Sequence, residues 1–119
     1  MPEGHVRMIE KAAEANQNVI VVLMSGSVVE MPWISNVKAV LYMGLPGQAG
    51  GEAIANLLSG KVNPSGKLAE TWPISYNDCV CKDYYGVPYK DAQYRESIYV
   101  GYRYYETAGV KVQFPFGYG

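Results

Sequence analysis

The chain has 119 residues, of which 49% are hydrophobic and 18% charged, and ten Lys and Arg against eleven Asp and Glu give a net charge of -1. This composition predicts one globular domain and excludes a disordered chain, and the balanced charge indicates neither a nucleic-acid partner nor an anionic membrane surface. No apolar run approaches the roughly 20 residues of a membrane span, and the opening MPEGHVRMIEKAAEA lacks the apolar core of a signal peptide.

The chain begins with a helical pattern that is followed by two extended ones. In the opening segment, Val6, Ile9 and Ala13 recur at the spacing of one buried helix face. The run VIVVLM at 19–24 is apolar without alternation, which predicts a strand covered on both faces. An irregular connection at 25–36 then leads to VKAVLYM at 37–43, which predicts a second strand.

The next segments complete a helix and strand alternation. The stretch EAIANLLSG at 52–60 predicts a second helix, with Gly60 in the left-handed position beyond its end. NPSG at 63–66 predicts a turn, and KLAETWP at 67–73 predicts a short third strand that Pro73 ends. The order predicts an α/β fold over 1–73, with a partial doubly wound, mostly parallel sheet and flanking helices.

The glycine-rich stretch GLPGQAGGEA at 44–53 has the composition of a phosphate-binding loop between a strand and a helix. Its glycines at 44, 47, 50 and 51 match neither G-x-G-x-x-G nor G-x-x-x-x-G-K-[ST]. Glu70 stands where a dinucleotide site carries its ribose-binding acid, but this is one match of several that such a site needs. A tight turn with close helix packing is the favoured interpretation, and a nucleotide-binding domain stays a remote alternative.

The second part of the chain, 74–119, changes character and is expected to be a tyrosine-rich irregular cover with one strand at 98–106, IYVGYRYYE. Nine of the eleven tyrosines lie in a thirty-residue stretch: Tyr76, Tyr84, Tyr85, Tyr89, Tyr94, Tyr99, Tyr102, Tyr104 and Tyr105. Such rings can stack on sugars, but more often they cover a sheet edge. We expect Leu68, Trp72, Tyr99, Tyr102 and the two rings of FPFG to be buried.

The sequence contains no self-contained catalytic set. The acids in the regions that we expect to be ordered show no local pairing of the kind that glycosidic chemistry needs: Glu30, Glu52, Glu70, Glu96 and Glu106. Ser25 and Ser27 lack a nucleophile-elbow context, and His5 is far from them in the sequence. We therefore assign no catalytic, cofactor-binding or metal-binding residue and expect no cofactor, and substrate-binding residues are not identified.

The two cysteines, Cys79 and Cys81, are separated by one residue. A bridge across this spacing would be strained, and two thiols with the distant His5 do not make a zinc site. Two reduced thiols in a loop are the favoured interpretation, and they weakly indicate a reducing compartment such as the cytoplasm.

Three segments together resemble a known family. PGQAGGEAIANLLSGKVNPSGKL, VGYRYYE and the closing FPFGYG occur in the order found in the C-terminal α/β-sandwich domain of glycoside hydrolase family 3, whose members include β-glucosidases and β-xylosidases. The resemblance runs over nearly the whole chain. It implies that GLPGQAGGEA is the strand-to-helix turn of that domain and that 1–119 is a single, partial α/β-sandwich domain.

The resemblance also implies where catalysis takes place. Family members carry the nucleophilic aspartate on a preceding TIM barrel, and many carry the acid/base glutamate on a loop before the helix that opens this chain. Neither segment is matched here, so neither role is transferred to a residue of this sequence. Ser97 stands where a glycine often follows the glutamate, which predicts a local backbone effect.

The partners implied are the rest of a parent enzyme and, in that enzyme, a β-linked oligosaccharide or glycoside. The leading hypothesis is a non-catalytic fragment of a retaining β-glycoside hydrolase, with a carbohydrate-binding or interaction module as the alternative. We expect the isolated chain to form a homodimer or other association, because the strand at 19–24 needs a neighbour on each edge.

Overall fold

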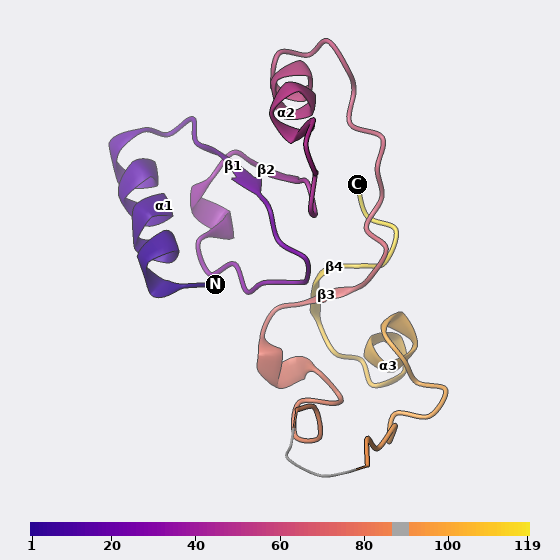
Figure 1. Cartoon of the computed structure of the whole chain (residues 1–119). Coiled ribbons are helices and arrows are strands. Elements are labelled where there is room, and N and C mark those ends of the chain that lie inside the picture. Colours follow the sequence, from indigo (N-terminus) through magenta and orange to yellow (C-terminus); the bar gives the residue numbers. More distant parts are fainter. Residues whose placement is uncertain (87–90) are drawn as a thin grey trace. The chain divides into compact units, whose positions relative to one another are not determined.

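A computed structural model describes residues 1–86 and 91–119, so that Tyr89 of the tyrosine group lies outside the described residues. The described chain separates into two compact units, which we call unit 1 (Met1–Pro64) and unit 2 (Ser65–Gly119). Figure 1 shows their helices and strands in chain order. The α/β class is confirmed, whereas the assignment of 1–119 to a single domain with a boundary at 73 stays a prediction.

Unit 1 opens with helix α1, Glu3–Ala15, as predicted. Pro2 precedes the first turn and Glu3 lies within it, where an acidic side chain suits the helix dipole. The expected apolar stripe is present, because Ile9 is buried while Val6 and Ala13 are half-buried. The exposed ion pair between Lys11 Nζ and Glu14 Oε2, at 2.6 Å, adds little stability.

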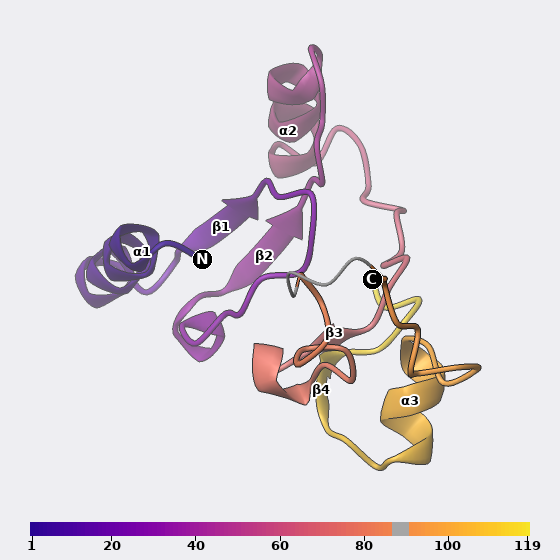
Figure 2. The ribbon, with the colours of Figure 1, turned by 60° about the horizontal axis from the view of Figure 1, so that its bottom comes forward.

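Strands β1 (Ile20–Leu23) and β2 (Ala39–Tyr42) pair in parallel, with Ile20 opposite Ala39 and Leu23 opposite Tyr42. Figure 2 shows the two strands side by side, with α1 on the β1 side. Among the described residues, β1 hydrogen-bonds only to β2, and 51% of the surface of Ile20 is exposed. The expectation that this strand is covered on both faces is therefore wrong for this chain, because Ile20 is exposed and Val21 and Val22 are only half-buried. Covering both faces of a parallel strand requires helices on both sides of the sheet.

The connection between these strands contains the short 3-10 helix η1, Ile34–Asn36, and supplies much of the core of unit 1. Trp33 is fully buried, and Met31 is 5% exposed. After β2, the chain turns through the glycine-rich stretch into helix α2, Gly50–Leu58. Gly60 has φ +74° and ends this helix as predicted, since its left-handed backbone lets the Gly60 N–H bond the Leu57 carbonyl at 3.1 Å.

Unit 2 is built on an antiparallel strand pair instead of a continuation of the parallel sheet. Strands β3 (Trp72–Pro73) and β4 (Val112–Phe114) pair with Trp72 opposite Phe114, and a register shift separates Trp72 from Pro73. Hydrogen bonds between Leu68 and the Gly117–Tyr118 segment, each 2.8 Å long, continue the contact. The predicted third strand is thus real but only two residues long, and no turn forms at the predicted NPSG segment.

The expectation of a strand at 98–106 is wrong. Residues Tyr102–Thr107 form helix α3, which follows Gly101 at φ +58°, and the 3-10 helix η2 (Tyr76–Asp78) lies earlier in unit 2. High β-propensity of tyrosine favoured a strand, but it reflects packing on a half-buried surface and yields to context. In the helix, Tyr102, Tyr105 and Glu106 share one face at i, i+3 and i+4 spacing.

Burial of the aromatic residues is also more limited than expected. Trp72 is 2% exposed and meets the Phe114 ring edge-on at 6.3 Å between centroids. In contrast, Tyr99 is 47% exposed, Tyr102 40% and Phe116 55%, so their predicted burial is wrong. A small unit cannot cover so many rings, because its surface is large relative to its volume. Among the described residues, no helix has the length and apolar character needed to cross a bilayer.

Candidate functional site

The glycine-rich stretch is explained by backbone geometry. Gly44 and Gly47 have φ +58° and +67°, a conformation that costs other residues energy. Gly50, at the start of α2, is buried, and a Cβ atom placed on it would lie 2.8 Å from Pro46 Cβ and Cγ. Gly51, by contrast, has open space around its Cβ position. The turn interpretation accounts for three of the four glycines without a ligand.

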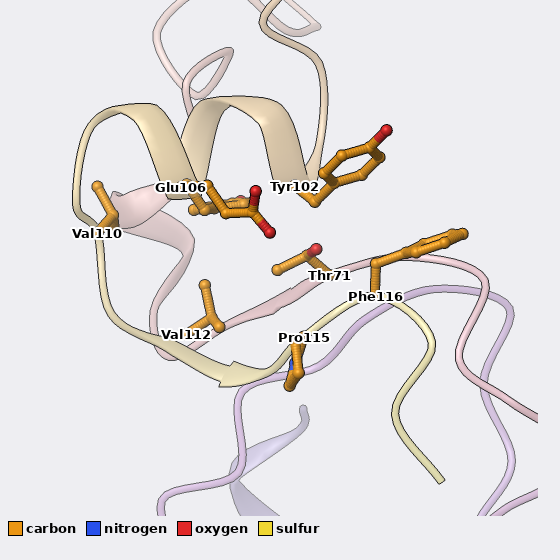
Figure 3. Close-up of a pocket in the computed structure, with 8 residues that line it drawn as sticks. Thr71, Tyr102, Glu106, Val110, Val112, Pro115 and Phe116 are labelled. Carbon is orange, nitrogen blue, oxygen red and sulfur yellow. The ribbon is translucent and has the colours of Figure 1, made fainter.

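A concave site lies in unit 2, between α3 and the β3–β4 pair (Figure 3). Its volume is about 360 Å³, within the lower range of small-ligand pockets. Its polar lining comes from Thr71, Tyr102, Tyr105 and Glu106. Its apolar lining comes from Val110, Val112, Pro115 and Phe116. We call this the α3 pocket.

Two polar side chains of the α3 pocket have no partner in the part of the chain that the structure describes. Thr71 is only 8% exposed, and its Oγ1 atom is buried without a hydrogen bond. Glu106 is exposed and makes no ion pair with a described residue. Figure 3 shows the Thr71 hydroxyl and the Glu106 carboxylate facing the same hollow. A buried hydroxyl without a partner is costly, so Thr71 Oγ1 has an unused hydrogen-bonding capacity on the lining of the pocket.

Aromatic rings form the other walls of the α3 pocket. The Tyr102 and Phe116 rings lie 5.5 Å apart between centroids at an angle of 32°. Tyr105 contributes its ring, while its hydroxyl donates to Cys79 Sγ at 3.9 Å. Burial raises the pKa of the Tyr105 phenol, and Cys79 raises that pKa further, so this group stays protonated and neutral at physiological pH.

A second cavity of unit 2, of about 280 Å³, lies against the other side of α3 and is lined by Arg95, Glu96, Tyr99 and Tyr104, with Val80, Thr107 and Ala108. The Arg95 guanidinium lies over the Tyr84 ring, with Cζ 4.1 Å from its centroid. Ser97, next to Glu96, has φ +52° and is the only non-glycine residue with positive φ among those described. This agrees with the backbone effect expected where a glycine often stands.

The residues considered as catalytic candidates are not brought together. Glu106 and Glu96 line separate cavities, Glu70 lies next to Thr71 but lines neither of them, and Glu30 and Glu52 belong to unit 1. The Ser25 hydroxyl donates to the Ser27 carbonyl at 2.7 Å, and His5 lies on the exposed side of α1. In the described ranges, no three His, Cys, Asp or Glu side chains gather as metal ligands would. Cys79 and Cys81 form no disulfide bond and are half-buried.

Sequence reasoning missed the α3 pocket because it assigned a strand to the segment that forms α3. In a strand, Tyr102 and Tyr105 would point to opposite faces. The available signal was the i, i+3, i+4 spacing of Tyr102, Tyr105 and Glu106, which places them on one helix face. Thr71 and Phe116 come from distant segments and had no local signal.

Comparison with known proteins gives a consistent result over the whole chain. The family described as "Glycosyl hydrolase family 3 C-terminal domain" matches residues 1–119. Thermostable beta-glucosidase B of Acetivibrio thermocellus is 51% identical over 123 residues, which cover 100% of this chain and 16% of the relative. Exo-alpha-(1->6)-L-arabinopyranosidase of Bifidobacterium breve is 45% identical over 120 residues, with the same coverage of 100% and 16%.

Solved structures of beta-glucosidases also match nearly the whole chain. The crystal structure of a GH3 beta-glucosidase from Bifidobacterium adolescentis matches with a TM-score of 0.90 and 44% identity, covering 99% of this chain and 18% of that one. A beta-glucosidase from Kluyveromyces marxianus in complex with glucose matches with a TM-score of 0.95 and 38% identity, covering 100% and 14%. The chain therefore spans less than a fifth of the length of these proteins.

Proposed function

The chain belongs to glycosyl hydrolase family 3, as a segment of the family's C-terminal domain, and from this premise we propose that it is a non-catalytic part of a retaining β-glycoside hydrolase. The observation that carries the proposal is the asymmetry of coverage, since the relative at 51% identity matches the whole chain with only 16% of its own length. Because that relative is a beta-glucosidase, the proposed substrate of the parent enzyme is a terminal β-linked glucoside.

The distribution of carboxylates supports a non-catalytic role. A retaining glycosidase needs two carboxyl groups about 5–5.5 Å apart, one as nucleophile and one as acid and base. The α3 pocket contains one carboxylate, Glu106, and the second cavity contains one, Glu96. Neither cavity thus provides the pair. The contribution of this chain is then to complete the fold of the domain, with the reacting groups supplied by other segments of the parent.

An activity assay tests this proposal directly. The purified chain is incubated with an aryl β-glucoside, with a family 3 β-glucosidase as the positive control and Glu106→Gln and Glu96→Gln variants in parallel. We expect no release of the aryl alcohol above the enzyme-free rate. Turnover by the chain that either Gln variant abolishes would contradict the proposal, because it would show that the chain contains a working carboxylate.

A carbohydrate-binding module is the second candidate, and exposure of the tyrosines favours it. Tyr85, Tyr94 and Tyr99 are 79%, 83% and 47% exposed, so their rings are available for stacking. Titration with glucose, cellobiose and xylobiose while tyrosine and tryptophan fluorescence is recorded distinguishes the candidates. Saturable change that differs between the sugars would support a binding module, and a flat response would leave only the non-catalytic segment.

A further inference from the structure

The α3 pocket presents groups that attract a positive charge. Glu106 supplies a carboxylate that no described basic side chain pairs. The Thr71 hydroxyl, buried and without a partner, can accept a hydrogen bond beside it. None of the eight lining residues is a Lys, Arg or His, so the lining carries no compensating charge.

The aromatic walls add to this preference. The face of an aromatic ring carries partial negative charge and attracts ammonium and guanidinium groups. Tyr102 and Phe116 both line the pocket, with 5.5 Å between their ring centroids (Figure 3). The Tyr102 ring already accepts a guanidinium of its own chain, since Arg103 Cζ lies 5.8 Å from its centroid, and Arg103 does not line the pocket.

The apolar lining is suited to an alkyl chain. Val110, Val112 and Pro115 form an aliphatic wall, and a volume of about 360 Å³ accommodates one long side chain with its terminal group. A lysine or arginine combines an apolar stem with a charged end that only donates hydrogen bonds. Its stem would contact the aliphatic wall while its charged end bonds Glu106 and Thr71.

We propose that the α3 pocket binds the alkylammonium or guanidinium group of a lysine or arginine side chain from outside these 119 residues. The preference for a cation is inferred from the residues that line the pocket. That the cation belongs to another segment of the same enzyme rests on the proposed function, in which this chain is part of a larger protein. Relatives extend far beyond the matched segment, since it is 14–18% of their length in the cases described above. Binding would neutralise Glu106 and satisfy the buried Thr71 hydroxyl.

The test uses side-chain analogues and the isotopically labelled 119-residue chain. The probes are n-butylammonium and n-butylguanidinium, with 1-butanol as the neutral analogue and methyl β-D-glucopyranoside as a sugar. We expect saturable amide shifts at 71, 102, 106 and 116 with the two cations only. Glu106→Gln should weaken this binding by about tenfold or more, because it removes the charge from the acceptor.

Two further variants separate the effect of the pocket groups from a general change in charge. Glu70→Gln removes the same charge one residue from Thr71 without altering the pocket lining, so its affinity should stay within about twofold of the unchanged chain. Thr71→Val removes the hydroxyl while keeping the side-chain shape. If Thr71→Val fails to fold, the comparison of Glu106→Gln with Glu70→Gln carries the test alone.

The outcomes separate this proposal from its alternatives. Equal binding of 1-butanol, saturable binding of the glucoside alone, or no saturation with any probe would each overturn it. In the intact parent enzyme, the two cations should no longer bind, because a basic side chain of that enzyme already fills the pocket. Binding of the cations to the intact enzyme would refute the proposal that the side chain comes from the parent. These readouts do not depend on hydrolysis, so their failure is distinguishable from a failure of the proposed function.

Discussion

Two neighbouring glycines at the start of α2 should respond to the same substitution in opposite directions. A Cβ atom at Gly50 would lie 2.8 Å from both Cβ and Cγ of Pro46, whereas a Cβ atom at Gly51 would meet nothing within 4 Å. The proline ring is rigid and cannot rotate away as a flexible side chain could. Gly50→Ala should therefore destabilise the chain, and Gly51→Ala should not.

The magnitudes follow from the geometry. To reach an ordinary contact of 3.4 Å, Pro46 and residue 50 must separate by about 0.6 Å, and overpacking of this kind costs roughly 1–3 kcal/mol. Alanine in a helix is more stable than glycine by about 0.5–1 kcal/mol. At position 50 this gain offsets part of the cost of overpacking, whereas at position 51 there is no such cost and the gain remains. We expect Gly50→Ala to lower the free energy of unfolding by about 1–2 kcal/mol and Gly51→Ala to raise it by about 0.5 kcal/mol.

Urea unfolding followed by far-UV circular dichroism measures both variants beside the unchanged chain. The midpoints should move in opposite directions with unchanged slopes, since neither substitution alters the surface exposed on unfolding. Because the two variants share one background, their difference does not depend on the absolute stability of the chain. A Gly50→Ala midpoint at or above that of Gly51→Ala would refute the reasoning, since it would mean that the close contact with Pro46 does not constrain this turn.

Other positions give further predictions. Gly47→Ala should lower the free energy of unfolding by about 1–2 kcal/mol, because its φ of +67° places an added Cβ in a strained conformation; an unchanged urea midpoint would contradict this. Ser97→Gly should raise that free energy by up to about 1 kcal/mol, because it relieves strain at φ +52°, and a lower thermal midpoint would show that the serine side chain makes a compensating contact. Burial raises the pKa of Tyr105 above its ordinary value of 10.0, so the stability that its neutral form provides is complete below pH 10.0 and is lost as pH rises beyond it. Tyr105→Phe should flatten this alkaline loss in urea midpoints measured across that range, and an equally steep loss would assign it to other groups. Finally, light scattering across a concentration series should show association of the isolated chain, because β1 has one described neighbour and an exposed Ile20; a monomer at high concentration would mean that its open edge is protected.

The sequence by itself determined the local elements of unit 1. The spacing of Val6, Ile9 and Ala13 predicted α1, and the apolar β-branched run at 19–24 predicted β1. Gly60 marked the end of α2 because a left-handed residue there depends only on nearby backbone atoms. The ordered motifs also identified the family, since they are properties of the sequence and need no structure.

Only the tertiary structure decided unit 2 and its candidate site. Strand β3 pairs with β4, which lies about forty residues later in the sequence, and no local pattern specifies a partner at that distance. Tyr102, Tyr104 and Tyr105 have strand propensity, but they lie in helix α3. In this helix, the Tyr102 ring contacts the ring of Phe116 from the end of the chain. That helix turns Tyr105 and Glu106 toward Thr71 and creates the α3 pocket. Local propensity amounts to tenths of a kcal/mol per residue, whereas burying a large ring such as that of Trp72, which is 2% exposed, amounts to whole kcal/mol, so long-range packing determined the strand pair of unit 2.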